Sequence, residues 1–197
     1  MISFDLFLKG IDFFEIETGR NQELIKQLSG MEGLAFKLTC SSPRNSYQKD
    51  SSLDSDIKKY LLDNGNKLIN PNFPQCPINI AYDFALRIGD KNVVFEIEKA
   101  NKEKILYDYL KAHIYMDYGI DNVVIIAPKN WVHAHGTYDL FKVAKERISL
   151  CYQYQMGNEK KLKKILIVGF TQIYNNQIHS NTTLAKINQK CKLYFQT

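Results

Sequence analysis

A short run of β-branched residues constrains the fold of this chain more than any other feature. Residues 122–127 read NVVIIA, and Pro128 ends the run. A continuous apolar run of this length is typical of a strand that is buried on both faces, as strands of parallel sheets are. Residues 102–119, just before it, carry apolar side chains at helical spacing and close with Gly119. A helix followed by such a strand predicts a sheet with helices packed against it.

Periodicity and turn residues place the other elements around this strand. The segments that we expect to be regular are helices at 21–31, 55–63 and 140–152, strands at 34–39 and 165–170, and a hairpin over 82–98. Residues 1–17 fit either a strand or a short helix, while 129–139 and 156–164 are expected to be connections. The order predicts an α/β fold, a mixed central β-sheet flanked by helices. The length of 197 residues predicts a single domain, residues 1–197.

Composition excludes several classes of protein. Hydrophobic residues make up 45% and charged residues 24%, the balance of an ordinary globular protein. No signal sequence and no apolar run near 18 residues is visible, so we expect a cytoplasmic protein without a membrane span. The four cysteines lie far apart, which favours reduced thiols over disulfides or a zinc site. The net charge of +5, with lysines clustered at 160–164, suits a polyanionic partner, although such a cluster is more often a solvated surface.

Three acidic residues flank the expected hairpin. Asp83 precedes its first apolar run, and Glu96 and Glu98 end its second, with Ile97 between them. Residues two apart on a strand share a face, so both glutamates point the same way and Asp83 comes to lie across from them. Carboxylate oxygens are the natural ligands of Mg²⁺. The alternative is a solvated strand end whose acids point into water.

Residues from about 57 to 180 resemble the PD-(D/E)xK nuclease superfamily, and in particular type II restriction endonucleases of the BamHI and BglII kind. The resemblance lies in VFEIEKAN, a long helix, NVVIIAP, a further helix and ILIVGF, in that order. It implies that Asp83 and Glu96 bind Mg²⁺, that the backbone carbonyl of Ile97 completes the site, and that Glu98 is the general base. Asn70 stands roughly where the family has a further metal ligand. Lys99 falls on the opposite strand face, which favours Glu98 as the base.

The resemblance also implies where DNA is read. In the family, bases are contacted from the start of the helix after the motif and from the loop after the next strand. The corresponding residues here are Asn101, Lys102, Lys104, His133, His135, Thr137, Tyr138 and Asp139. Asn, Lys and Asp side chains can each bond base edges. The alternatives are a helix N-cap at Asn101, a solvated first helical turn and a His-x-His zinc spacing, which lacks a third ligand nearby.

The function implied by the resemblance is Mg²⁺-dependent, sequence-specific cleavage of double-stranded DNA at a palindromic site. A homodimer would match the two-fold symmetry of such a site, with the helix over 101–118 as its dimer element. A structure-specific repair or recombination nuclease of the same fold, and a non-catalytic DNA-binding protein, are the alternatives.

Overall fold

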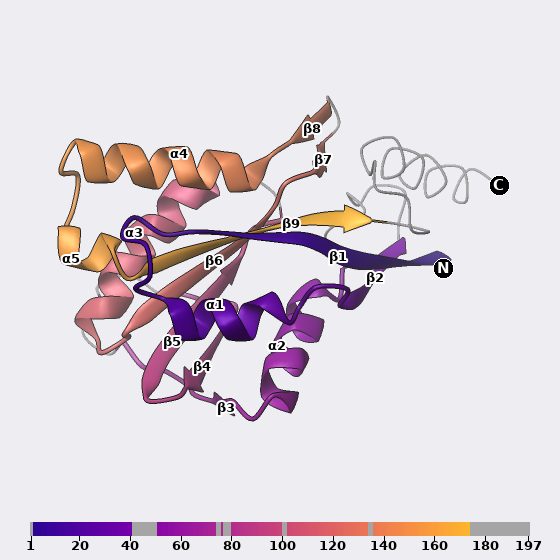
Figure 1. Ribbon diagram of the computed structural model, residues 1–197, viewed down its shortest axis with the longest axis horizontal. Helices are drawn as coiled ribbons and strands as arrows, with labels where there is room; N and C mark the ends of the chain where they lie inside the picture. The colour runs from indigo at the N-terminus through magenta and orange to yellow at the C-terminus, as the bar shows by residue number, and fades with distance from the viewer. Residues whose placement is uncertain are drawn as a thin grey trace.

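A seven-stranded mixed sheet forms the centre of the protein (Figure 1). The computed structural model describes residues 2–40, 51–73, 76, 80–99, 102–133 and 136–173, without side-chain detail at 2–4, 38–40, 131–133 and 136–138. The sheet has the order β2-β1-β9-β6-β5-β4-β3. Its strands are β1 (Ile2–Phe14), β2 (Ala35–Cys40), β3 (Lys67–Leu68), β4 (Phe84–Ile88), β5 (Lys91–Ile97), β6 (Asn122–Pro128) and β9 (Ile165–Ile173). The predicted α/β class, a mixed sheet flanked by helices, is confirmed.

The run NVVIIA is the middle of the sheet. It forms β6, which pairs in parallel with β5 on one side and with β9 on the other. Its side chains alternate between two apolar cores, since Val124 and Ile126 belong to one and Val123 and Ile125 to the other. This explains the unbroken apolar pattern, because neither face of the strand reaches water.

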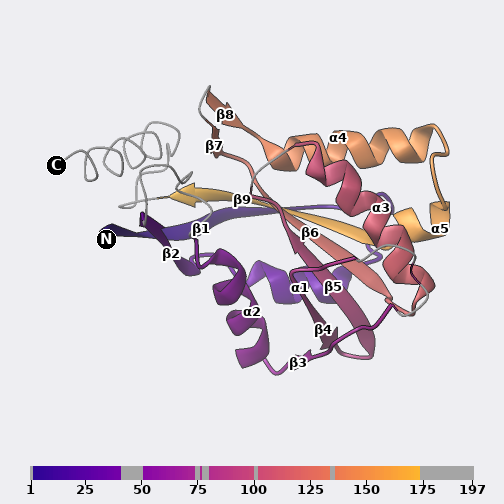
Figure 2. The same ribbon diagram turned by 180° about the vertical axis from the view of Figure 1, so that it is seen from behind.

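Helices cover both faces of the sheet (Figures 1 and 2). The helices are α1 (Gln22–Ser29), α2 (Leu53–Asp63), α3 (Lys104–Asp117), α4 (Leu140–Gln153) and α5 (Glu159–Leu162). The first core joins the sheet to α1 and α2, through residues such as Leu28 and Ile57. The second joins it to α3, α4 and α5, through Ala112, Phe141 and Leu162. Successive side chains of β5 therefore point alternately toward one helical layer and the other.

Some local predictions were wrong or undecided. Residues 129–139 are not only a loop, because they contain the two-stranded sheet of β7 (Trp131–His133) and β8 (Gly136–Tyr138). The link at 156–164 contains α5. Residues 1–17, left undecided, contain β1, whose alternating pattern is satisfied by pairing with both β2 and β9. The helix expected from Ser55 begins at Leu53, with Ser52 at its N-cap.

Within the part of the chain that the structure describes, no helix is long and apolar enough to cross a bilayer. The cysteines whose side chains the structure describes, Cys76 and Cys151, are free thiols.

Candidate active site

The hairpin of β4 and β5 delivers Asp83 to the end of β5. Its turn lies at Gly89, which adopts a φ of 61°, and its last cross-strand pair is Phe84 with Phe95, whose rings stack at 4.7 Å. Beyond this pair the Asp83 side chain takes the place of a strand partner, since its Oδ2 accepts a hydrogen bond from the Ile97 N–H at 2.5 Å. The N–H and C=O of one strand residue lie on the same edge. The Ile97 carbonyl therefore faces the edge where Asp83 lies.

Glu96 lies on the α3 side of the sheet and is buried. Its Oε1 lies 2.7 Å from Lys111 Nζ and accepts a hydrogen bond of 2.7 Å from the Tyr115 hydroxyl, both on α3. Burial raises the pKa of Glu96 to about 7, although Lys111 opposes this rise. The contacts with Lys111 and Tyr115 thus hold the carboxyl group in place, but they only partly offset the free-energy cost of removing its charge from water.

Glu98 is also buried and contacts the same helix, so the predicted common orientation of the two glutamates is confirmed. Its Oε1 lies 2.5 Å from Lys104 Nζ. Its other oxygen, Oε2, is buried and makes no hydrogen bond to any described side chain or backbone group by distance and angle. Burial raises the pKa of Glu98 to about 9, and the neighbouring carboxyl group of Asp108 raises it further.

Lys111 is the central cation of this buried group. Its ammonium group forms ion pairs with Glu96 at 2.7 Å and Asp108 at 2.8 Å, and it donates a hydrogen bond to the Ala81 carbonyl oxygen at 3.2 Å. Asp108 itself is fully buried. Such a cluster persists in a core only when its charges are paired.

Lys99 turns to the opposite face of the sheet, as its position in the strand predicts. It forms an ion pair of 2.6 Å with Asp54, in the first turn of α2. Burial raises the pKa of Asp54, and Asp83 adds to the rise while Lys99 lowers it. Asp54 thus lies near Asp83, on the side of β5 away from Glu96 and Glu98.

The structure brings the predicted acids to one strand end but does not join them into one cluster. Among the described residues, no three acidic, histidine or cysteine side chains are grouped so that they could hold a metal ion. Asp83 bonds the backbone of Ile97, whereas Glu96 and Glu98 face the lysines of α3. Asn70 lies exposed in the segment that leads to the hairpin.

The residues expected to read DNA have separate positions. Lys102 is exposed just before α3, and Lys104 is bound to Glu98. Asp139 is the N-cap of α4, and its side chain accepts a hydrogen bond of 2.7 Å from the Lys142 N–H. His133, Thr137 and Tyr138 belong to β7 and β8, where side chains are not described; Asn101 and His135 lie outside the described residues.

Sequence reasoning missed Asp108, Lys111 and Tyr115 of α3. With Lys104, which was expected to read DNA, they are spaced i, i+4, i+7 and i+11, so all four lie on one face of the helix. This spacing was visible in the sequence. Apolar periodicity, however, placed Leu106 and Leu110 on the buried face, and both are exposed. Asp108 and Lys111 are buried instead because each finds a charged partner there.

The clustered lysines lie at the other end of the sheet. Ile165 pairs with Val123, and Val123 with Val94, so Lys164 is level with Val93, five residues before Glu98. At ~3.3 Å per residue this is a separation of roughly 16 Å along the strands.

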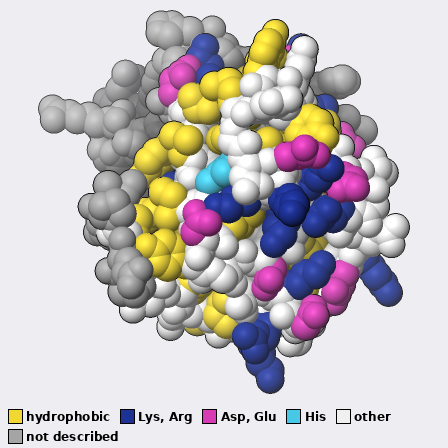
Figure 3. Space-filling view, turned by 90° about the vertical axis from the view of Figure 1, so that its left-hand side faces the viewer, with side chains coloured by type: hydrophobic (Ala, Val, Ile, Leu, Met, Phe, Trp, Pro, Cys, Tyr) yellow, Lys and Arg dark blue, Asp and Glu magenta, His cyan; other side chains and the backbone are white. Residues whose placement is uncertain are grey.

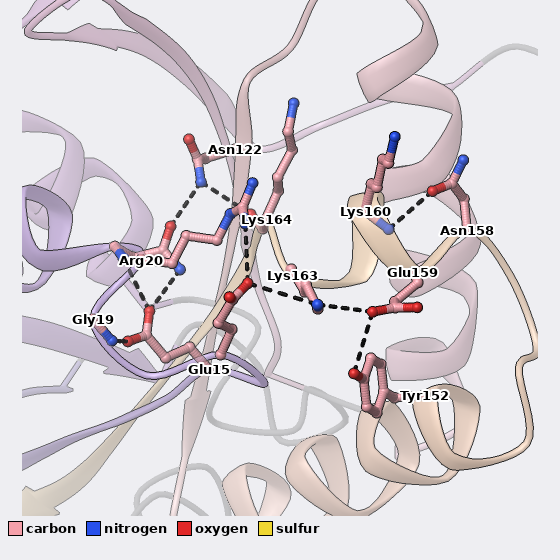
Figure 4. Close-up of polar contacts among 12 residues, drawn as sticks. Glu15, Gly19, Arg20, Asn122, Tyr152, Asn158, Glu159, Lys160, Lys163 and Lys164 are labelled. Carbon is pink, nitrogen blue, oxygen red and sulfur yellow. Dashed lines mark hydrogen bonds and ion pairs between the residues drawn. The ribbon is translucent and has the colours of Figure 1, made fainter.

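Acidic side chains lie among the basic ones on this end of the molecule (Figure 3). Lys163 Nζ lies 2.7 Å from Glu159 (Figure 4). It also lies 3.8 Å from Glu17. Lys161 pairs with Asp117. These contacts weaken the case for the lysine cluster as a DNA surface.

No protein-family profile matches the chain, and no curated protein sequence matches it. Among solved structures, the crystal structure of restriction endonuclease BglII complexed with a DNA 16-mer is similar, with a TM-score of 0.53 at 13% sequence identity. The likeness covers 85% of this chain and 78% of that chain. Free BglII is also similar, with a TM-score of 0.43 at 13% identity over 81% of this chain and 78% of that one. The protein therefore has a restriction-endonuclease-like fold.

Proposed function

We propose that the protein is a Mg²⁺-dependent endonuclease that cleaves double-stranded DNA at a specific palindromic site. The observation that carries the proposal is the end of β5, where Asp83 bonds Ile97 between Glu96 and Glu98, on a sheet whose fold resembles that of BglII. The BglII structure similar to this one is a complex with DNA. The proposal of a nuclease rests on the acids at the end of β5 together with the fold. The proposal of site specificity rests on the resemblance of the sequence to type II restriction endonucleases.

The charges at this strand end fit a bound divalent cation. The carboxyl groups of Asp83, Glu96, Glu98 and Asp108 outnumber the ammonium groups of Lys104 and Lys111 among the described neighbours. Burial and a hydrogen bond with the neighbouring carboxyl group of Asp108 raise the pKa of Glu98 to about 9. The proton that Glu98 holds offsets part of this excess in the metal-free protein, and a bound cation would take the place of that proton.

Asp83, Glu96 and the Ile97 carbonyl would hold Mg²⁺, with Asn70 as a candidate for a further contact. Bound there, the ion would lower the pKa of a coordinated water and offset charge that develops on the phosphate. Lys111 and Tyr115 both contact Oε1 of Glu96, so Oε2 would be the oxygen that binds the cation.

Glu98 is proposed to accept a proton from the attacking water at Oε2. A buried carboxylate with a high proton affinity is a strong base, provided that it first loses its own proton. A nearby cation favours that loss. Lys99, paired with Asp54 on the other face, is not proposed to take part in proton transfer.

DNA recognition remains a proposal for the start of α3 and for residues 133–139, together with Asn101. A homodimer is proposed through α3, whose outer face exposes apolar side chains: Leu106, Tyr107 and Leu110. Two copies would place one active site on each DNA strand.

Digestion of plasmid DNA with Mg²⁺, and with EDTA as control, tests the proposal. Discrete fragments support a site-specific endonuclease, whereas a smear or removal of flaps supports a repair nuclease. Asp83→Ala should abolish cleavage and preserve DNA binding, because it removes a proposed ligand and some negative charge near the phosphate. Asp90→Ala, in the exposed hairpin turn, is the matched control. Full cleavage by Asp83→Ala would show that the metal-site assignment is wrong.

A further inference from the structure

Two side chains of α3 bond both segments that carry the proposed metal ligands. Lys111 Nζ lies 2.7 Å from Glu96 Oε1 on β5 and 3.2 Å from the carbonyl oxygen of Ala81, two residues before Asp83. The Tyr115 hydroxyl lies 2.7 Å from the same Glu96 oxygen and 2.9 Å from the same Ala81 oxygen. Both donors thus lie between the same two oxygens, one on each segment, and the single hydroxyl proton of Tyr115 reaches one of them at a time.

We propose that Lys111 and Tyr115 form a clamp that sets the position of Asp83 relative to Glu96. Both are positioning residues, because they act through the groups that they hold and not on DNA. The inference rests on the proposed function for its consequence, which is the affinity of the site for a cation.

The clamp is needed because the backbone alone does not fix Asp83. The ladder between β4 and β5 ends at Phe84 and Phe95, so Asp83 lies beyond the last backbone pair. Its placement there depends on its own bond to the Ile97 N–H and on how Ala81 is held. Side chains that orient metal-binding carboxylates typically change metal affinity 10- to 100-fold when they are removed.

Packing keeps the hydroxyl of Tyr115 in place. The residue is fully buried, and its ring contacts the rings of Phe73 at 5.2 Å and Tyr82 at 6.2 Å. Tyr82 lies directly between Ala81 and Asp83, so the aromatic contact supports the same segment. Removal of the hydroxyl alone leaves these ring contacts intact.

Tyr115→Phe is the test, and Tyr109→Phe is its matched control. Tyr109 lies on the same helix, is also buried, and donates its hydroxyl hydrogen bond to the Met156 carbonyl at 2.8 Å, away from the acids. Both variants lose one buried hydroxyl. Any difference between them therefore reports the bonds to Glu96 and Ala81 and not a general loss of stability, which urea unfolding of both variants would measure.

The first readout needs no metal. Hydrogen exchange of the Ile97 amide, followed by NMR, reports the bond to Asp83. It should become about tenfold faster in Tyr115→Phe, the change expected from one lost hydrogen bond, and should not change in Tyr109→Phe. Equal exchange in both variants would overturn the clamp.

The second readout is calorimetric titration of Ca²⁺ into the protein–DNA complex, since Ca²⁺ also prefers oxygen ligands. Tyr115→Phe should weaken binding about tenfold relative to Tyr109→Phe. If the wild-type protein binds no Ca²⁺ and cuts no DNA while the Ile97 amide still responds, the proposed function fails and the clamp stands. If the wild-type protein binds and cuts but the two variants behave alike, the clamp fails and the proposed function stands.

Discussion

Substitution of Glu98 by glutamine should change how the stability of the metal-free protein depends on pH. Burial raises the pKa of Glu98 to about 9, whereas in the unfolded chain it is near the ordinary value of 4.5. Between these values the folded protein holds a proton that the unfolded chain lacks. The free energy of unfolding must therefore fall as the pH rises through this window. A glutamine side chain resembles the protonated acid in shape and hydrogen bonding but cannot ionise.

The size of the effect follows from the linkage of one proton. One proton held only by the folded state lowers the free energy of unfolding by roughly 3 kcal/mol over two pH units. The side chain of Glu98 is fully buried, so solvent screening does not reduce this figure appreciably. From pH 6.5 to 8.5, Glu98→Gln should therefore gain about 3 kcal/mol relative to the wild-type protein. The pKa of Lys104 is raised, so this lysine stays charged throughout the range and adds no slope.

Urea unfolding in EDTA, followed by circular dichroism at several pH values, measures this difference. Glu96→Gln is the control, because burial raises the pKa of Glu96 only to about 7. Its gain relative to the wild-type protein should level off above that pH, whereas the gain of Glu98→Gln should continue. If the curves of Glu98→Gln and the wild-type protein stay parallel from pH 6.5 to 8.5, the assigned protonation of Glu98 is wrong.

Two further predictions concern the buried Lys111 of α3 and the N-cap of α4. Lys111→Met should lower the free energy of unfolding by about 3–5 kcal/mol, because it leaves Glu96 and Asp108 buried without their cation. Lys59→Met, at an exposed ion pair, should change it by less than about 1 kcal/mol in the same urea titration. Asp139→Ala should cost about 1 kcal/mol in thermal unfolding, since it removes an N-cap, whereas Asp139→Asn should keep the cap. If Asp139 also reads a base, both variants should lose discrimination between cognate and scrambled duplexes; a loss confined to stability in Asp139→Ala would assign it to the cap alone.

The order and class of the elements could be predicted from the sequence because local patterns reflect local surroundings. NVVIIA is apolar throughout because β6 lies between two cores, and Gly119 ends α3 with a φ of 86°, which glycine adopts readily. The common orientation of Glu96 and Glu98 also follows from strand geometry alone, as does the position of Lys99 on the opposite face. Each of these properties depends on a few neighbouring residues.

Other features depended on contacts between distant segments. Residues 1–17 could not be assigned because an alternating pattern becomes a strand only when partners exist, and β1 finds them in β2 and β9. The β7–β8 hairpin was missed because its strands have three residues each, too few to show a period. The polar face of α3 was missed because the apolar spacing predicted that Leu106 and Leu110 face the core, whereas both are exposed.

Residue order and strand periodicity are therefore enough to show that three acids stand at the ends of a hairpin beside a buried parallel strand. The sequence could not determine their environment, because the pKa of a carboxyl group depends on what surrounds it in space. Only the tertiary structure placed Lys111 and Tyr115 against Glu96, and Asp108 beside Glu98. Only the tertiary structure also brought Asp54 to Lys99 across 45 residues of chain. Burial by α3 is the physical reason that two surface-like glutamates become groups with strongly raised proton affinity.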